Sequence, residues 1–411
     1  MMVLRRRTPA RRSRSEWAVR GVLALVAAGA GYVSVASTAA YVIGSGNPEL
    51  AHVLSPNDGR ITEAMAAKFS GPQATPTDRE SADRLAKEAL RQDPTAVTAA
   101  STLGINAQVR GDTPQARRIF AYASFLSRRD LQTQLWSIED AVGRGNIAEA
   151  LTHYDIALRT SRNAAGLLFP VLASAISETS VRDNLVRTLA GRPSWADLFI
   201  EYVSANTPDP KAAAQLFERL IRAGVPVSSL SRSLLINTLA SRDDLADAWS
   251  FYASTHPGAD PARSRDIYFT GSTDHPSVFD WTPGNENGIV TSIQRSQRGG
   301  VADFFAPASV GGTLLQQVQR FSPGKYRLQG HGTGIEQPAD SRPYWVLTCR
   351  SGQEVGRVEL PNSAQNGGEF SGQFVVPDNC PVQILSLVAR PSDAIAGTTG
   401  QIDRLQVAPT R

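Results

Sequence analysis

The pattern of hydrophobic and polar residues divides the chain into three parts. Residues 21–43 carry no charged side chain and are rich in alanine and valine. From about residue 78 to 256, apolar residues recur at the three- and four-residue spacing of amphipathic helices. From residue 257 onward the apolar residues alternate with polar ones in short runs, separated by Gly, Pro, Asn and Asp. The pattern predicts one long apolar helix, then a helical domain, then an antiparallel β domain.

The apolar segment is long enough to cross a membrane. A helix of residues 21–43 measures roughly 34 Å, against a hydrocarbon core of about 30 Å. It follows a basic segment with one acid, Glu16, and the arginines Arg5, Arg6, Arg7, Arg11, Arg12, Arg14 and Arg20. Positive charge on one flank keeps that flank in the cytoplasm. We therefore expect a basic cytoplasmic tail (1–20), a single transmembrane helix (21–43) in a bacterial inner membrane, and a periplasmic body.

A cleaved signal peptide is the alternative interpretation of this segment. Small-residue triplets that a signal peptidase accepts occur at Ser37-Thr38-Ala39 and Thr38-Ala39-Ala40. The apolar run is longer than the usual core of about 7–15 residues, and it ends in Tyr41-Val42-Ile43 instead of a polar stretch. The sequence favours an uncleaved anchor but leaves cleavage open.

Small residues in the helical part recur with a period of 34 residues. Ala82, Ala116 and Ala150 keep this spacing, and the dipeptides at 111–112 and 145–146, Gly-Asp and Gly-Asn, keep it too. A helical pair with small residues at a fixed period is typical of a solenoid, in which small side chains let neighbouring helices approach closely. Glycine at 111 and 145 suits a turn that needs positive φ.

The repeat resembles the tetratricopeptide family. Its small-and-large pattern is carried by Leu103, Gly104, Ala107, Gly111, Ala116, Phe120 and Ala123, and more loosely in the next unit by Ala150, Tyr154 and Ala157. The resemblance implies a superhelix of helix pairs over residues 78–256, with degenerate pairs after residue 164. It also implies binding of peptides or other proteins. Residues 44–77, which contain several prolines, are expected to be a linker with one short helix around residues 62–69.

The last part, 257–411, is expected to form an antiparallel β-sandwich of about eight or nine strands. The phrase Pro323-Gly324-Lys325-Tyr326 entering a strand resembles jelly-roll carbohydrate-binding modules. Such modules stack sugars on exposed aromatic rings with polar groups around them. The candidate glycan platform consists of Trp281, Asp280, Tyr344 and Trp345. The alternative is that these aromatic side chains belong to the sandwich core.

The chain has two cysteines, Cys349 and Cys380, outside any metal-binding spacing. In an oxidising periplasm we expect one structural disulfide between them. Two buried free thiols remain the alternative.

The net charge and the missing catalytic motifs limit the classes of function that the sequence allows. Apart from the seven N-terminal arginines and Glu16 the chain is nearly neutral, with a net charge of about −2, so a nucleic-acid surface is not expected. The sequence lacks an H-E-x-x-H helix, a nucleophile elbow and a phosphate loop. We therefore expect no catalytic residues, no metal site, no cofactor and no enzymatic activity.

Taken together, the sequence predicts a membrane-anchored periplasmic scaffold. Its helical repeats are expected to bind other envelope proteins, in envelope or surface-polysaccharide assembly or export. One alternative is a carbohydrate-binding protein that grips polysaccharide through the β-sandwich. A second is an enzyme with an unfamiliar site in the sandwich. The sequence does not identify the partner, a glycan or the oligomeric state.

Overall fold

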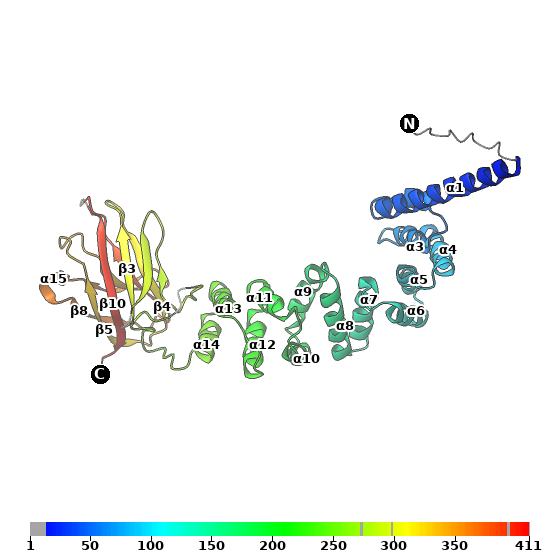
Figure 1. The fold of residues 1–411 in the computed structure, drawn as a ribbon. Coiled ribbons are helices and arrows are strands. Elements are labelled where there is room, and N and C mark those ends of the chain that lie inside the picture. Colours follow the sequence, from blue (N-terminus) through cyan, green and yellow to red (C-terminus); the bar gives the residue numbers. More distant parts are fainter. Residues whose placement is uncertain (1–13, 272–273, 297–298, 393–394, 411) are drawn as a thin grey trace, which may run out of the picture. The chain divides into compact units, whose positions relative to one another are not determined.

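The computed structural model describes residues 14–271, 274–296, 299–392 and 395–410. The chain divides into two compact units, which we call the N-terminal unit (1–165) and the C-terminal unit (166–411). Figure 1 shows an apolar helix first, then paired helices, then two β-sheets. This order confirms the predicted fold class. Most of the predicted basic tail, residues 1–13, lies outside the described residues.

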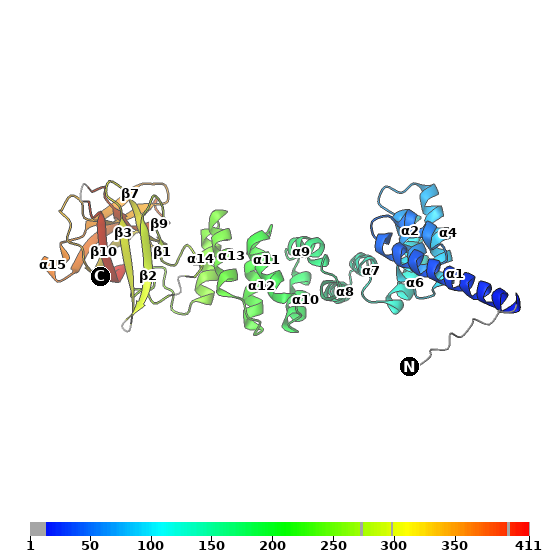
Figure 2. The same ribbon diagram turned by 45° about the horizontal axis from the view of Figure 1, so that its top comes forward.

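Helix α1 (Arg14–Gly44) is the one helix of the described chain long and apolar enough to cross a membrane. Its C-terminal end does not stand alone. Short helices α2 (Pro48–Leu54) and α3 (Gly59–Lys68) follow, and α2 lies against the end of α1 (Figure 2). Ala40 on α1 is completely buried together with Ala51 of α2 and Ile61 of α3. The end of the candidate membrane helix is therefore part of the folded N-terminal unit.

The segment 44–77, expected to be a linker, holds both α2 and α3 in the structure. Its prolines do not break the helices: Pro48 occupies the first turn of α2 and Pro76 the first turn of the helix that follows α3, where a missing N–H costs nothing, and α3 contains no proline. Asn47 and Asp58 cap the two short helices with their side chains. Proline content alone suggested a spacer; the polar residue before each helix is the signal of a helix start.

The repeat helices of the N-terminal unit pack as antiparallel pairs. The helices are α4 (Pro76–Gln92), α5 (Val97–Val109), α6 (Thr113–Leu126), α7 (Leu131–Gly143) and α8 (Ile147–Thr160). Gly111 and Gly145, in the turns of the α5–α6 and α7–α8 pairs, both have positive φ. The small residues of the repeat, Ala107, Ala116, Ala123, Ala150 and Ala157, are buried between helices. The helical part is therefore tetratricopeptide-like in fold.

Helices α5 and α6 approach each other closely because residue 104 on α5 is a glycine. A Cβ atom there would lie 2.7 Å from the ring of Phe120 on the facing helix. Phe120 is buried and stacks at 4.4 Å on Trp136 of α7, so its ring joins one pair to the next. Leu103 is half-buried beside it, and Tyr154 takes the position of Phe120 in the following pair, where it is also buried.

We expect Gly104→Ala to destabilise the N-terminal unit by about 1–3 kcal/mol, because the added methyl overpacks the contact with Phe120. The measurement is the urea midpoint of the full-length protein followed by circular dichroism. Gly143→Ala is the matched control, since a Cβ at this helical glycine meets nothing within 4 Å. Equal midpoints for the two variants would contradict this packing argument.

A carboxylate connects consecutive pairs. Asp140 on α7 accepts from the Arg117 guanidinium of α6 at 2.6 Å and from Arg144 at 3.0 Å. Its side chain is only 10% exposed. Hydrogen bonding to Arg117 holds the pKa of Asp140 below its usual value; Arg144 adds to this, and burial opposes it.

This pairing makes the stability depend on pH. A carboxyl with a lowered pKa in the folded state stabilises the protein above its unfolded pKa, near 4, and that contribution is lost as the pH falls through the folded value. Both arginine partners are largely exposed, so we expect Asp140→Asn to cost only about 1 kcal/mol at pH 7. The difference from the parent protein should disappear below about pH 3. Urea unfolding across this range checks it, with exposed Glu139→Gln as control; a difference that persists at low pH would contradict the ion pair.

Helices continue in the C-terminal unit. They are α9 (Ala164–Ala175), which begins just before the unit boundary, α10 (Thr179–Ala190), α11 (Ala196–Asn206), α12 (Pro210–Arg222), α13 (Ser229–Ser241) and α14 (Leu245–Thr255). The apolar stripe of α12, with Leu216, Phe217 and Leu220, is fully buried. Helix α14 then leads into the β-sandwich.

The sandwich has two antiparallel five-stranded sheets, with the order β1-β4-β9-β6-β7 in sheet A and β2-β3-β10-β5-β8 in sheet B. Sheet A contains β1 (Thr282–Pro283), β4 (Gly312–Gln319), β6 (Tyr344–Cys349), β7 (Glu354–Glu359) and β9 (Gln383–Ala389). Sheet B contains β2 (Val290–Ser296), β3 (Gly299–Ala306), β5 (Gly324–Thr333), β8 (Glu369–Val376) and β10 (Thr398–Pro409). A four-residue helix, α15 (Ser363–Asn366), precedes β8. Inward-facing residues of both sheets form one core.

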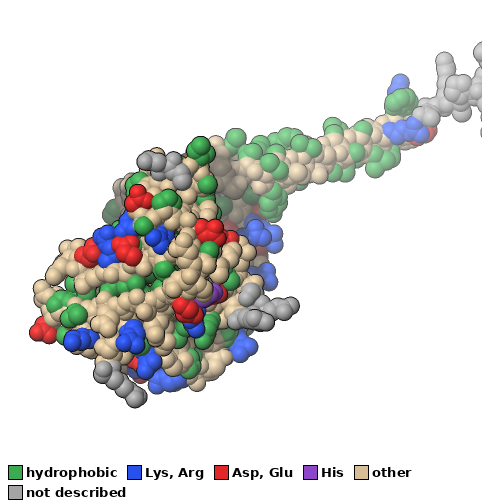
Figure 3. Space-filling view, turned by 90° about the vertical axis from the view of Figure 1, so that its left-hand side faces the viewer, with side chains coloured by type: hydrophobic (Ala, Val, Ile, Leu, Met, Phe, Trp, Pro, Cys, Tyr) green, Lys and Arg blue, Asp and Glu red, His purple; other side chains and the backbone are tan. Residues whose placement is uncertain are grey.

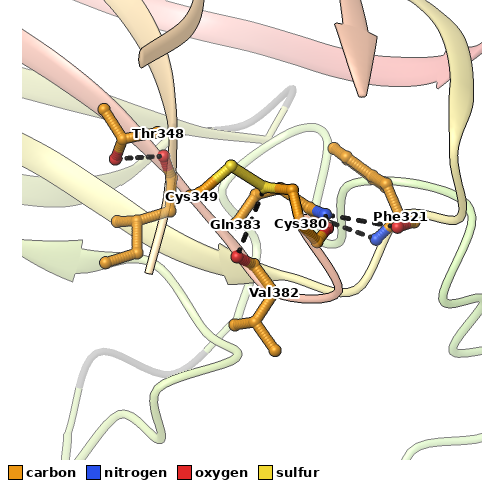
Figure 4. Close-up of a disulfide and its surroundings, with 7 residues drawn as sticks. Phe321, Thr348, Cys349, Cys380, Val382 and Gln383 are labelled. Carbon is orange, nitrogen blue, oxygen red and sulfur yellow. Dashed lines mark hydrogen bonds between the residues drawn. A yellow bond between two sulfur atoms is a disulfide. The ribbon is translucent and has the colours of Figure 1, made fainter. Parts of the chain in front are cut away.

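The two cysteines form the predicted disulfide (Figure 4). It links Cys349, at the end of β6, to Cys380 in the loop that enters β9, and both residues are buried. Beside it the Gln383 amide accepts from Phe321 N and donates to the carbonyls of Phe321 and Cys380. The bond therefore closes one end of the sandwich around a buried, fully hydrogen-bonded glutamine.

Candidate interaction surfaces

The repeat helices carry exposed apolar side chains that their own packing does not use. Val109 at the end of α5 and Val142 at the end of α7 are both more than half exposed, and Phe125 on α6 is 86% exposed. Val109 and Val142 occupy nearly equivalent places in consecutive pairs. Large exposed apolar residues on a repeat surface are typical of sites where another protein docks.

Helices α13 and α14 contact the β-sandwich through an interface within the C-terminal unit. Its centre is Arg265, which is only 7% exposed. The guanidinium donates to Phe279 O at 2.9 Å, to Gln319 Oε1 at 3.1 Å and to the Val318 carbonyl. It also lies 5.2 Å from the ring of Trp249 on α14. Burial lowers the pKa of Arg265 to about 10, so the group keeps its charge at neutral pH.

Two further contacts reinforce this interface. The Tyr252 hydroxyl on α14 donates to Asp280 Oδ1 at 2.9 Å, and the other Asp280 oxygen accepts from Ser277 N and Oγ. Burial raises the pKa of Tyr252, and the Asp280 charge adds to the shift. On α13, Asn237 accepts from Val278 N at 2.9 Å. The sandwich is therefore held directly by α13 and α14.

We expect Arg265→Gln to destabilise the C-terminal unit by about 2–4 kcal/mol, because the shorter side chain leaves buried carbonyls without donors. Limited proteolysis should then cut the connection at 256–263 much faster, and the thermal midpoint should fall. Arg263→Gln is the matched control, since Arg263 is exposed and paired only with Asp260 at the surface. Parent-like proteolysis of Arg265→Gln would show that the guanidinium does not hold the interface.

The structure places the members of the candidate glycan platform apart. Trp281 is 3% exposed and Trp345 is completely buried, and their rings lie 5.9 Å apart in the sandwich core. Trp281 Nε1 donates to Asp266 O. Neither indole presents a face to solvent on which a sugar could stack. Asp280 is engaged with Tyr252 in the interface with α14.

Tyr344, the remaining member, lies half-buried on the outer side of sheet A. Its ring is flanked by two guanidinium groups, Arg357 at 4.1 Å and Arg390 at 4.6 Å from the ring centre. Each arginine is paired with a glutamate, Glu354 and Glu359 respectively. Two of the protein's own cations therefore already lie against the phenol ring.

A groove of about 710 Å³ lies on the outer face of sheet B, across β8, β5 and β10. Figure 3 views the molecule from this side and shows a hollowed face with acidic and basic side chains around it. Amide and hydroxyl groups of Gln329, Gln406 and Ser371 line it, and Tyr268, about half exposed, lies at its edge. Tyr268 is positioned by backbone hydrogen bonds, because Leu405 N donates to Ile267 O and Gly300 N to Tyr268 O.

The charged groups that line this groove are all in ion pairs, Glu359 with Arg390 outside it and Arg404 with Glu369 within it. Arg404 on β10 binds Glu369 on β8 at 2.6 Å. On the same face, His331 Nδ1 lies 2.8 Å from Asp403 Oδ1. The ring of His331 also packs on Gly368, where a Cβ atom would lie 2.7 Å from Nε2. His331 is thus held in strand β5 as part of a cross-strand pair with Asp403 on β10.

The described residues contain no group of three or more His, Cys, Asp or Glu that could hold a metal ion. The groove residues and Arg265 were not among the predicted sites. Alternation marks outward positions on strands, but it does not reveal which strands are neighbours, so a surface assembled from β5, β8 and β10 cannot be recognised from sequence.

Comparisons with known proteins give limited information. No protein-family model matches the chain, and no curated protein does. Among solved structures it is similar to the glycosylation-associated protein (Gap123) complex from Streptococcus agalactiae, with 14% identity and a TM-score of 0.22 over 34% of this chain and 43% of that chain. It is also similar to PilF of Pseudomonas aeruginosa, with 16% identity and a TM-score of 0.29 over 55% and 95%.

A further similarity is to accessory secretory proteins 1, 2 and 3 of Streptococcus pneumoniae, with 12% identity and a TM-score of 0.24 over 36% of this chain and 97% of that chain. The chain spans less than half of the length of the Streptococcus agalactiae protein it matches. These scores are too low to support conclusions about fold or function. Both therefore rest on the residues described above.

Proposed function

We propose that this protein is a non-enzymatic scaffold, anchored in a bacterial inner membrane by α1, whose periplasmic repeat helices bind partner proteins. The observation that carries the proposal is the exposed apolar set Val109, Phe125 and Val142 on a tetratricopeptide-like fold. A repeat domain that buries its small residues and exposes large apolar ones has surface available for a partner.

Three further features support the membrane placement. The arginines gather on the N-terminal flank of α1, which favours a cytoplasmic N-terminus. The disulfide between Cys349 and Cys380 requires an oxidising compartment such as the periplasm. Cleavage after Ala39 or Ala40 would cut α1 inside the turns that pack on Ala51 and Ile61, so the packing favours an uncleaved anchor.

A role in envelope or surface-polysaccharide assembly or export is the biological setting that we propose for such a scaffold. The proposed scaffold combines a membrane anchor, a protein-binding repeat surface and a second, polar surface on the sandwich. This setting is drawn from the architecture, and architecture alone does not define function.

The proposal is tested by affinity purification of the full-length protein from native membranes in mild detergent. We expect co-purified envelope proteins, and a several-fold loss of them in the double variant Val109→Ser/Val142→Ser, because each substitution removes apolar surface from the docking site. Val375→Ser is the matched control, an equally exposed valine on strand β8. Unchanged partner recovery in the double variant would overturn the assigned surface.

Carbohydrate binding through the sandwich is the second candidate function, now located at the groove on sheet B. The groove combines amide side chains with the exposed Tyr268, the combination that sugar hydroxyls and pyranose faces require. The same purification distinguishes the two functions when sugars are analysed with proteins. Polymer that is lost in Tyr268→Ala, with no co-purified protein, would favour this candidate over the scaffold.

A further inference from the structure

The inference concerns where the lipid bilayer ends along α1, and it rests on the proposed membrane anchor. From Val19 to Val35 the large side chains of α1 are exposed, each by more than half. Ala36 and Ala40 are buried instead, because α2 and α3 pack against this end of the helix. On the face that α2 and α3 cover, the surface of α1 available to lipid therefore stops before the apolar sequence does, whereas Tyr41 and Val42 stay exposed on the other face.

Charged groups lie beside the last turns of α1. The Tyr41 hydroxyl donates to Asp58 Oδ2 at 2.7 Å, and Asp58 also caps α3 through its other oxygen. Glu49 on α2 is paired with Lys68 on α3 at 2.8 Å. Placing an ionised side chain within hydrocarbon is strongly unfavourable. These groups place Tyr41 in the headgroup region, where tyrosine is common.

On the face of α1 that α2 and α3 cover, the stretch that can contact lipid is short. From Gly21 to Ala36 the helix rises about 24 Å at 1.5 Å per residue, against a hydrocarbon core of about 30 Å. A span that is too short is accommodated by local thinning of the bilayer or by apolar groups of neighbouring elements. Helix α2 supplies such groups, since Leu50 is 49% and Val53 is 75% exposed.

Leu50 and Val53 lie at the height of the last turns of α1. Ala51, between them in sequence, contacts the end of α1 next to Ala40, and a Cβ at Gly44 would lie 3.8 Å from Ala51 Cβ. The rise along a helix from residue 51 to residues 50 and 53 is only about 3 Å at most. Leu50 and Val53 are therefore continuous with the exposed apolar surface of α1.

We infer that α2 is an interfacial helix whose Leu50 and Val53 insert into the lipid of the outer leaflet, so that the folded N-terminal unit rests on the membrane surface. The occupant of this apolar face is the bilayer. The short, partly buried α2 acts with α1 as one hairpin, and the two helices together supply the apolar length that α1 lacks.

The test uses the full-length protein in liposomes of phosphatidylcholine and phosphatidylglycerol. Its two native cysteines are bonded to each other, so a nitroxide can be attached at one new cysteine in each of Val26→Cys, Val53→Cys and Phe125→Cys. The collision rates with oxygen, which concentrates in lipid, and with a water-soluble nickel chelate report the depth of each label.

At position 26, in the middle of the span, we expect a strong preference for oxygen. At position 53 the oxygen-to-nickel ratio should exceed that at position 125, an exposed residue on α6, by several-fold. A ratio at 53 equal to that at 125, with 26 still buried in lipid, would overturn the interfacial helix and leave the anchor standing. A water-exposed label at position 26 would overturn the membrane anchor itself.

Discussion

Burial of Ala40 against Ala51 and Ile61 is the contact on which the account of this protein depends. It makes the last two turns of an otherwise exposed apolar helix part of the folded N-terminal unit. A flexible connection would let the folded part of the chain move freely relative to α1. This packing instead fixes the direction in which the chain continues after α1. Because alanine faces alanine, the helices approach closely, and neither α1 nor α2 can rotate without opening the contact.

The same combination, small residues at helix contacts and buried side chains that hydrogen-bond between elements, recurs along the chain. Gly104 admits the ring of Phe120, and Asn106 is buried while bonded to Ser70, Arg79 and Asp83. In the C-terminal unit, Arg265 is buried at the start of the sandwich, where it donates to the Phe279 carbonyl and lies over the ring of Trp249. These polar centres fix geometry within each unit. The surfaces that they leave exposed, apolar on the repeats and polar on sheet B, are those at which we propose binding.

The sequence predicted the order of the elements, the 34-residue pairing and the disulfide, because each depends on local spacing or on a pair with one solution. Local patterns do not show how strands are ordered, so the groove on sheet B and the burial of Trp281 were not predicted. Trp281 sits next to Pro283 and Gly284 and resembles a loop residue, yet its ring fills the core beside Trp345. Helix α2 was missed because Pro48, placed at its start, is also typical of a linker, whereas the short helix expected around residues 62–69 corresponds to α3.

The central claim is that α1 is retained as a membrane anchor and completes the fold. The most direct measurement is the intact mass of the protein purified from membranes of a bacterial host. The account predicts a chain that still contains the residues before Ala39, recovered in the membrane fraction. A soluble periplasmic chain that begins at Ala40 or Tyr41 would contradict it, because the contact of Ala40 with Ala51 and Ile61 would then be cut from its helix.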